Sequence, residues 1–562
     1  MQIIYKCFIV LSLFSINCVT ASACDDICNP QNNCNNSCDI DCSSSNVFGK
    51  TFFSYRPQDS NVARRMVGVI DTINQYESEC TYGTVSASVQ YSQTRNPKKL
   101  AEFFSFTGKN PMSYGPTCGE FDIYGINFGT TSTNGGAFSD AHLGTATSEG
   151  GICLKPEIKN VIFDIDLYTN WNEYLCCLGE FNLWTRFNLP LVNTKWNLHM
   201  KDTCNIKEGS SVFTPFLVSS EDNQPPVPYK DLTQAFKGNQ TAQYAGKVNA
   251  QNQEIAFGDA PVLNFGRVNK EREKTALAGF HFELGCDLYK GEGSFVAAGL
   301  HMVAPTGNTP EAHYLFEPIA GANHSWQLGG TVQAGYQLWQ SNCDNKNISL
   351  YFDSIVTHLF PSKQRRLFGL LIDGKTSPGS SYLLLKQYDQ TGALLGLQRA
   401  ANLLACETKI IVDVMADLAL MLQYNSNCSM SGIGWNFWYR SKEKIECETI
   451  CNVRCCPFSH NDKYAIKGDT LANNRESESA STIGSCSAIE TPPVYLTDRD
   501  IDRSIALNPS AFSNKIFGFI GRNWNESEVW APYVLLEGEV EFGNKNHAAD
   551  QWAIMIKGGV SF

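Results

Sequence analysis

Beyond its first 23 residues, the sequence lacks an apolar run long enough to cross a membrane as a helix. The best candidate, residues 408–424, contains Lys409, Asp413 and Asp417, whereas a spanning helix needs about 20 mostly apolar residues. Read with a period of two, the same stretch gathers these three charges on one face. The sequence therefore predicts a long strand here and no transmembrane helix.

Motifs of common enzymes are also missing. The sequence has no G-x-S-x-G, no H-E-x-x-H, no phosphate-binding loop and no glycine fingerprint after a strand. His281 and Glu283 share one face of an alternating segment, where two inward polar side chains are the simpler interpretation. Ser139, Asp140 and His142 are neighbours in sequence only, which gives no triad geometry. We therefore expect no enzymatic activity, no cofactor and no metal site.

A basic surface for nucleic acid is absent as well, because the chain carries a net charge of −12. The sequence shows no repeat of fixed period. A nucleic-acid partner is therefore not expected.

The N-terminus has the pattern of an export signal. Lys6 precedes an apolar run over residues 7–16, and Ala21-Ser22-Ala23 follows as an A-x-A cleavage pattern. Residues 1–23 are therefore interpreted as a cleaved signal peptide. Cleavage after Ala23 leaves Cys24 first, so a lipoprotein signal acylated at Cys24 stays as the alternative. Lipoprotein signals prefer Leu where Ala21 stands, which favours ordinary cleavage.

Cysteine is abundant. Of the 22 Cys, Cys7 and Cys18 belong to the signal, and so many in an exported chain indicate an oxidising compartment. Residues 24–46 are polar and have little to bury. Disulfides are the favoured fate of two clusters, although the spacing of the second also permits zinc. The candidates are Cys24, Cys28, Cys34, Cys38 and Cys42, and Cys447, Cys451, Cys455 and Cys456.

Alternation of apolar and polar residues recurs along the chain, in runs that reach ten residues or more and exceed ordinary globular strands. A transmembrane strand needs about 9–11 residues that alternate between lipid and lumen. A secreted β-sandwich also alternates, but it predicts shorter strands. The runs lie within residues 161–167, 181–189, 280–288, 326–338, 408–424 and 534–542.

The last strand has one apolar face that extends to the final residue and comprises Trp552, Ile554, Ile556, Gly558, Val560 and Phe562. This pattern resembles the closing strand of Gram-negative outer-membrane β-barrels. The resemblance implies recognition by the barrel-assembly machinery. Residues 534–542 supply a hairpin partner through the polar residues 543–551, which places Phe562 at the periplasmic edge and that loop outside.

We therefore predict an all-β fold, an antiparallel transmembrane β-barrel of about 14–18 strands, even in number, over residues 47–562. The expected long loops are notably 204–262, 389–405 and 441–491, and residues 24–46 form a short Cys-rich segment before the barrel. The inward acidic candidates, which would favour cations, are Asp164, Asp166, Asp413, Asp417, Glu537, Glu539 and Glu541.

The favoured function is a porin-like channel or major envelope protein of the bacterial outer membrane that passes small solutes. One alternative is a structural or adhesive disulfide-linked surface protein on a plugged barrel, since the composition resembles the cysteine-rich major envelope proteins of chlamydiae. A second alternative is a secreted soluble β-rich protein. The expected partners are outer-membrane lipid, the barrel-assembly machinery, and other copies or envelope proteins linked by disulfides.

Overall fold

The structure is a computed structural model, and not every part of the chain is described. The described residues are 48–70, 82–114, 122–123, 126–127, 150–171, 182–202, 216–218, 227–228, 232–238, 242–244, 247–248, 254–255, 259–268, 270–341, 346–372, 374–446, 457–458, 462–466, 495–524, 530–544 and 550–562. Among them, no helix has the length and apolar character needed to cross a membrane.

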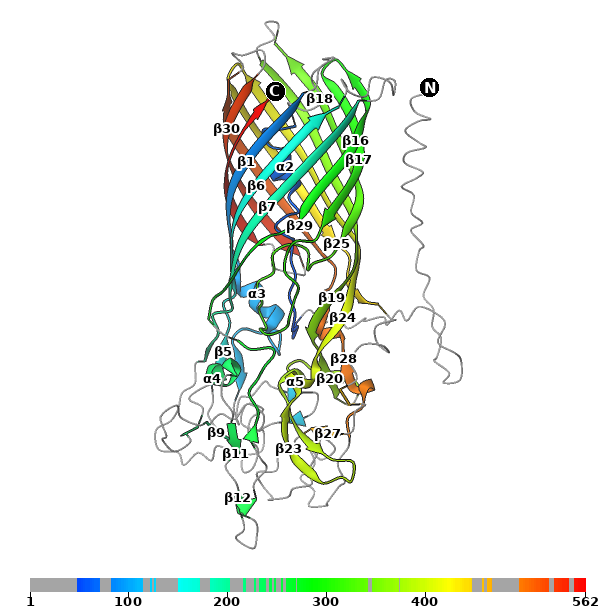
Figure 1. Cartoon of the computed structure of the whole chain (residues 1–562). Coiled ribbons are helices and arrows are strands. Elements are labelled where there is room, and N and C mark those ends of the chain that lie inside the picture. Colours follow the sequence, from blue (N-terminus) through cyan, green and yellow to red (C-terminus); the bar gives the residue numbers. More distant parts are fainter. Residues whose placement is uncertain are drawn as a thin grey trace, which may run out of the picture. The chain divides into compact units, whose positions relative to one another are not determined.

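Twelve antiparallel strands form a closed ring, which confirms the predicted barrel and its even strand number (Figure 1). The first and last strands pair with each other, and β6 pairs with β7 to complete the circle. In ring order the strands are β1 (Gly83–Thr94), β6 (Glu157–Asn170), β7 (Leu183–Asn197), β16 (Phe280–Gly291), β17 (Ser294–Ala304), β18 (Gln327–Gln340), β19 (Lys346–Leu367), β24 (Ala405–Ser426), β25 (Ser429–Arg440), β29 (Ala511–Asn523), β30 (Ala531–Asn544) and β31 (Gln551–Ser561).

The expected number of 14–18 strands is wrong. Two strands, β19 and β24, have 22 residues each, far more than a membrane crossing requires. Much of the remaining chain forms structure beyond the ring. An estimate from chain length alone therefore assigned too few residues to each strand and its connection.

Connections between the strands are mostly short at one end of the barrel and mostly long at the other. We call one end the turn end, where the connections span residues 171–182, 292–293, 341–345, 427–428 and 524–530. At the other, the loop end, they span residues 95–156, 198–279, 305–326, 368–404, 441–510 and 545–550. Short turns are periplasmic and long loops external in barrels of this kind. The β30–β31 hairpin forms as predicted, with its connection at the loop end.

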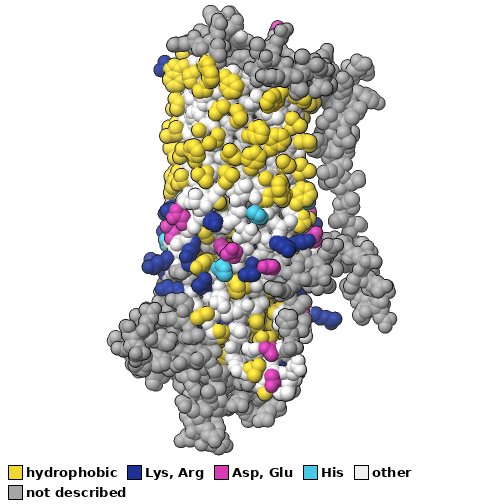
Figure 2. Space-filling model, viewed as in Figure 1, with side chains coloured by type: hydrophobic (Ala, Val, Ile, Leu, Met, Phe, Trp, Pro, Cys, Tyr) yellow, Lys and Arg dark blue, Asp and Glu magenta, His cyan; other side chains and the backbone are white. Residues whose placement is uncertain are grey.

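Side chains on the outer face of the ring form an apolar band (Figure 2). Val89, Phe163, Leu300, Ile520 and Ile556 are among the exposed members, and charged residues follow between this band and the loop end. A band of this type suits the hydrocarbon core of a bilayer.

Large aromatic residues border the apolar band on both sides, as interfacial girdles require. Exposed aromatic residues include Trp171, Tyr289, Tyr336, Trp339, Tyr424, Trp524, Trp530 and Phe562 toward the turn end and Trp326, Phe360, Trp435, Phe542 and Trp552 toward the loop end. Alternation does not place every aromatic residue outside. Trp438 and Tyr533 are buried within the barrel.

Along one long strand, the alternate residues that face inward change from one set to the other. Along β24, Ile410 and Val412 are buried before Asp413, whereas Met415 and Asp417 are buried after it. The pairing of β24 with β19 shifts register at this level, and such a bulge reverses which alternate residues face inward. The expected single alternation across residues 408–424 is therefore broken.

The long connections build a second body at the loop end, which we call the loop-end domain. Its elements include α3 (Pro97–Phe104), β2 (Met112–Tyr114), β5 (Gly150–Cys153), β8 (Lys201–Asp202), α4 (Leu232–Lys237), β15 (Arg272–Leu277), β20 (Gly369–Ile372), β21 (Lys375–Thr376), β22 (Leu384–Tyr388), β23 (Leu394–Arg399), α5 (Ala400–Leu404), β26 (Glu443–Ile445), β27 (Lys463–Ile466) and β28 (Ile501–Asp502). Shorter strands are β3 (Asp122–Ile123), β4 (Ile126–Asn127), β9 (Phe216–Val218), β10 (Val227–Pro228), β11 (Ala242–Tyr244), β12 (Lys247–Val248), β13 (Glu254–Ile255) and β14 (Asp259–Ala260).

The loop-end domain has a hydrophobic core of its own. Phe53, Phe104, Trp196, Phe316 and Leu384 are buried in one continuous cluster. Interpreting residues 389–405 as a loop was therefore wrong, since they form β23 and α5. Residues 204–262 and 441–491 likewise contain short strands and, in the first case, a helix. Apolar residues within these stretches pack against one another rather than against lipid.

Candidate functional site

The chain before the first barrel strand runs through the barrel. Thr51 binds the backbone of Ile505 at the loop end (N–H to O, 3.0 Å), and Ile70 packs with barrel residues farther along the lumen. β1 then starts at Gly83, at the turn end (Figure 1). Residues 55–70, which we call the lumen segment, therefore enter from the loop end.

A short helix, α2 (Val62–Met66), forms the middle of the lumen segment. The side chain of Asn61 accepts a hydrogen bond from the Arg64 N–H at 3.1 Å and caps the helix. The Asp417 carboxylate on β24 accepts from the Val62 N–H at 3.1 Å and from the Ser60 hydroxyl at 3.2 Å. A wall carboxylate thus satisfies the helix N-terminus, where negative charge is favourable.

Arg56 joins the lumen segment to three neighbouring parts of the wall. Its guanidinium lies 2.7 Å from Asp417, donates to the Asn436 side chain at 2.7 Å and lies 3.2 Å from Glu541. These partners come from β24, β25 and β30. Asn436 also donates to Asp417 at 2.6 Å, so the group forms one network.

Arg64 binds a different side of the barrel. It donates from Nε to Asp164 on β6 at 2.8 Å and from Nη1 to Gln90 on β1 at 3.0 Å. Its own carbonyl oxygen accepts a hydrogen bond from Lys557 of β31 at 2.9 Å. Side chain and backbone of this one residue therefore contact three strands.

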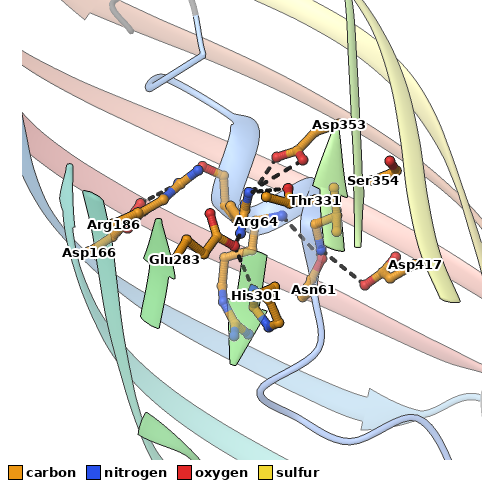
Figure 3. A network of polar contacts seen from close by, with 12 residues as sticks. Asn61, Arg64, Asp166, Arg186, Glu283, His301, Thr331, Asp353, Ser354 and Asp417 are labelled. Carbon is orange, nitrogen blue, oxygen red and sulfur yellow. Dashed lines mark hydrogen bonds and ion pairs between the residues drawn. The ribbon is translucent and has the colours of Figure 1, made fainter. Parts of the chain in front are cut away.

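Arg65 binds a third side of the barrel, where Glu283 and Asp353 point into the lumen (Figure 3). Its guanidinium pairs with Glu283 of β16, lies 3.0 Å from Asp353 of β19 and donates to Thr331 of β18 at 3.2 Å. Arg186 of β7, which pairs with Asp166, donates to the Arg65 carbonyl at 2.9 Å. The three arginines together thus reach nearly every side of the wall.

Between the three arginines and the turn end, apolar residues of the lumen segment pack against the barrel wall. Val62, Met66, Val67 and Ile70 are buried in a cluster with inward residues of the barrel strands. Gly68 has a φ of +73°, and a Cβ there would lie 2.4 Å from the Leu535 side chain. The chain therefore needs glycine where it turns against the wall.

Little space is left around the lumen segment. Cavities of about 20 Å³ each lie between the described parts of the segment and the wall. Such a volume holds about one water molecule. At the height of the three arginines, the described side chains of the lumen segment and of the wall therefore occupy space inside the barrel and lie in direct contact.

Two buried histidines lie among these contacts. His301 Nδ1 is 2.6 Å from Glu283 Oε1, and His281 Nδ1 is 3.4 Å from His301 Nε2. On its other side, His281 Nε2 is 3.3 Å from Asp59 of the lumen segment. His281 and Glu283 do share an inward face, and the lumen segment covers both.

Most of the predicted inward carboxylates are already paired inside the barrel. Asp164, Asp166, Asp417, Glu539 and Glu541 bind Arg64, Arg186, Arg56, Lys515 and Arg56, respectively. Glu537 is buried and its carboxylate makes no hydrogen bond within the described part of the chain. Asp164, Asp417 and Glu541 therefore bind the lumen segment, whereas Asp166 and Glu539 pair with residues of the wall itself.

Asp413 does not face the lumen, contrary to expectation. Its side chain is 44% exposed and lies 2.8 Å from Lys444. The bulge in β24 falls at this residue and turns it outward. One alternation pattern across the whole strand could not reveal this change.

The terminal apolar face lies where the sequence placed it. Trp552, Ile554, Ile556 and Phe562 point outward, and Gly558 and Val560 continue the same face of β31. The predicted disulfide candidates at residues 24–42 and 447–456 lie outside the described residues, as do Ser139, Asp140 and His142. Cys153, Cys286 and Cys428, which are described, are in no disulfide.

The arginines of the lumen segment were missed in the sequence. Their carboxylate partners lie 100 to 485 positions away, so no local pattern links them. The available signal was Arg64-Arg65 within an apolar stretch directly before the first barrel strand. Within the described ranges, no group of three or more His, Cys, Asp or Glu is arranged to hold a metal ion.

No protein-family model and no curated protein matches the sequence. Solved structures with a similar chain path include the translocator domain of the autotransporter NalP from Neisseria meningitidis, at 7% identity over 89% of this chain and 93% of that chain, with a TM-score of 0.26. The transport unit of the autotransporter AIDA-I from Escherichia coli gives 8% identity over 91% and 99%, with a TM-score of 0.29. A Pseudomonas aeruginosa FadL homologue gives 5% identity over 86% and 89%, with a TM-score of 0.25. With scores this low, function must be argued from the site itself.

Proposed function

We propose that this chain is an outer-membrane β-barrel that is closed at rest by its own lumen segment and presents the loop-end domain at the cell surface. One observation carries the proposal: Arg56, Arg64 and Arg65 bind carboxylates on different sides of the wall. In the resting state that we propose, solutes therefore do not pass freely as they would through a porin-like pore.

The size of the loop-end domain supports a role at the surface. Its buried core joins residues from five separate connections of the barrel and from the lumen segment's entrance. Simple hydrophilic loops around a diffusion pore would not need a shared hydrophobic core. We therefore favour a structural or adhesive surface protein, the plugged-barrel alternative from the sequence.

Disulfide linkage belongs to the same proposal. The two cysteine clusters suit bridges to other copies or to envelope proteins in an oxidising space. Isolated envelopes analysed on gels with and without reductant test this point. High-mass species that collapse on reduction are expected, and their absence would remove the linkage from the proposal.

A second candidate, a channel that opens when the lumen segment moves, has one observation in its favour. At mid-height the segment is held by ion pairs and hydrogen bonds to a polar wall, and such contacts can be replaced by water. Displacement would leave a lumen lined by charged and polar side chains.

Planar-bilayer recordings of the refolded full chain distinguish the closed surface protein from the channel that opens. The wild type should stay closed, and the triple variant Arg56→Ala, Arg64→Ala, Arg65→Ala should conduct. Arg365→Ala, at an exposed pair with Glu407, serves as the matched control and should stay closed. Steady conductance of the wild type would overturn the closed barrel, whereas frequent spontaneous openings would favour the regulated channel.

Export and membrane location are proposed on the signal pattern and the apolar band. Mass spectrometry of the mature N-terminus should find Cys24 first, and an added acyl mass would select the lipoprotein alternative. A folded barrel should resist SDS at room temperature and shift on heating. A chain recovered without detergent from the culture medium would instead support a secreted soluble protein.

A further inference from the structure

Two imidazoles connect the lumen segment with the wall in an unbroken row. Asp59 Oδ2 lies 3.3 Å from His281 Nε2, His281 Nδ1 lies 3.4 Å from His301 Nε2, and His301 Nδ1 lies 2.6 Å from Glu283 Oε1. Glu283 in turn pairs with Arg65. The row therefore begins and ends at residues of the lumen segment.

Counting protons shows that the row is one short. Each of its three contacts needs one hydrogen, and two neutral imidazoles carry one N–H each. When His301 donates to Glu283 and His281 donates to His301, His281 Nε2 turns a lone pair toward Asp59. Neither oxygen of Asp59 nor His281 Nε2 is hydrogen-bonded to a described residue, although all three atoms are buried, so the 3.3 Å approach is a close contact that a small rotation of either side chain can turn into a hydrogen bond.

We propose that His281 is a proton-binding site through which mild acid strengthens the closure of the barrel. A proton taken from solvent onto Nε2 yields an imidazolium, and this group donates to Asp59, which stays a carboxylate. The contact then becomes a charge-assisted hydrogen bond between the wall and the lumen segment. This inference rests on the proposed closed barrel and adds its regulation.

Other charged groups around His281 are already committed to partners. Arg64, Arg65 and Arg186 line the same cavity and oppose a positive imidazole. Each of them is bound to a carboxylate, namely Asp164, Glu283 and Asp166. Asp59 is the one carboxylate at the row that no Lys or Arg among the described residues contacts, so it decides where the additional proton is held.

The wall is shaped for this approach. Gly279 lies beside the contact, and a Cβ at that position would be 2.8 Å from Asp59 Oδ2 and 3.2 Å from His281 Nε2. The adjoining cavity, about 20 Å³, holds about one water molecule that can deliver the proton.

Hydrogen exchange of the full chain in lipid vesicles tests the inference. The readout is the protection of peptides from residues 55–70 at pH 5.5 and pH 7.5, corrected for the intrinsic exchange rate, because imidazoles titrate between these values. Protection should rise at pH 5.5, because the imidazolium adds a charge-assisted hydrogen bond between the wall and Asp59. His281→Gln and Asp59→Asn should each abolish the rise, whereas His358→Gln, at a histidine that contacts the Asp413 carbonyl instead, should retain it.

Two results would overturn the proton site. One is equal or lower protection of the wild type at pH 5.5, and the other is an unchanged rise in both His281→Gln and Asp59→Asn. Failure of the closed barrel itself gives a different result, since the segment would then lack protection at both pH values. If His281→Gln does not show the heat-dependent gel shift of a folded barrel, Asp59→Asn decides alone.

Discussion

The guanidinium of Arg56 lies 2.7 Å from the carboxylate of Asp417, and both side chains are at most 3% exposed. Removing one member of a buried ion pair leaves the other charge without compensation. We therefore expect Arg56→Ala to lower the free energy of unfolding by about 3–5 kcal/mol. Urea titration of the barrel refolded in lipid vesicles measures this difference.

The exposed pair Arg365–Glu407, at 3.2 Å, is the matched control. Exposed ion pairs contribute about 0–1 kcal/mol, so Arg365→Ala should change the same free energy by no more than that. Equal losses for both variants would mean that Arg56 acts only through its bulk, contrary to the network described above. In the double variant Arg56→Ala, Asp417→Asn, the loss should be smaller than the sum of the two single losses.

A methyl group at Gly279 should weaken the packing of the lumen segment against the wall. The added Cβ would meet Asp59, Val303 and His281 at 2.8 to 3.2 Å. Forced contacts of this kind cost about 1–3 kcal/mol, so Gly279→Ala should destabilise the barrel by that amount in the urea titration. Gly538→Ala, where a Cβ meets nothing within 4 Å, is the control and should have almost no effect. A stable Gly279→Ala barrel would show that Asp59 can move away without loss.

Glu317, in the connection between β17 and β18, should make the loop-end domain sensitive to pH. Burial raises the pKa of its carboxyl to about 7, against the hydrogen bonds that it accepts from the Glu311 and Ala312 N–H groups. Because the folded pKa lies above the unfolded one, the folded domain binds the proton more tightly. Stability should therefore fall as the pH rises from about 4.5 to about 7 and change no further above that.

Limited proteolysis of the loop-end domain between pH 4.5 and pH 8 follows this change. The side chain in Glu317→Gln stays neutral throughout. This variant should lose the part of the pH dependence of proteolysis that Glu317 causes. Glu311→Gln, at an exposed neighbour, is the comparison and should keep most of it. An identical slope in the wild type and in Glu317→Gln would assign the sensitivity to other groups.

Alternation of apolar and polar residues was sufficient to predict the strands of the barrel wall, because successive residues face lipid and lumen in turn. Residues 534–542 and 552–562 pair as the predicted hairpin for that reason. The same rule failed at Asp413, since a bulge adds one residue to a strand without changing its composition. The predicted strand number failed because residues such as Leu384 and Leu404 pack in a separate core beyond the ring and form no membrane strand.

The sequence predicted the wall residues of the site but not the residues of the lumen segment that bind them. Asp164, Asp417 and Glu541 were found because a wall strand places them at inward positions. Their partners were not, since Arg56 and Arg64 come from a segment with no period, and its contacts depend on the closed ring. Ion pairs between residues hundreds of positions apart leave no mark in a single sequence.

Phe562 closes the seam between the first and last strands, and its deletion should impair assembly into the membrane more than synthesis or export. Its N–H donates to the Gly83 carbonyl at 2.9 Å, and its carbonyl accepts from the Gly83 N–H at 2.8 Å. Its ring packs against Trp530, with centroids 5.9 Å apart. Deletion removes both the backbone bonds and the ring.

Phe562→Ala separates these two contributions, because it keeps the backbone bonds and removes only the ring. The amount of heat-modifiable barrel in isolated membranes is the measurement, with total chain as the reference. If the ring is what the assembly machinery reads, both variants should lose the folded band. If the seam alone matters, Phe562→Ala should assemble like the wild type. Normal assembly of the deletion variant would remove the assembly role from this residue altogether.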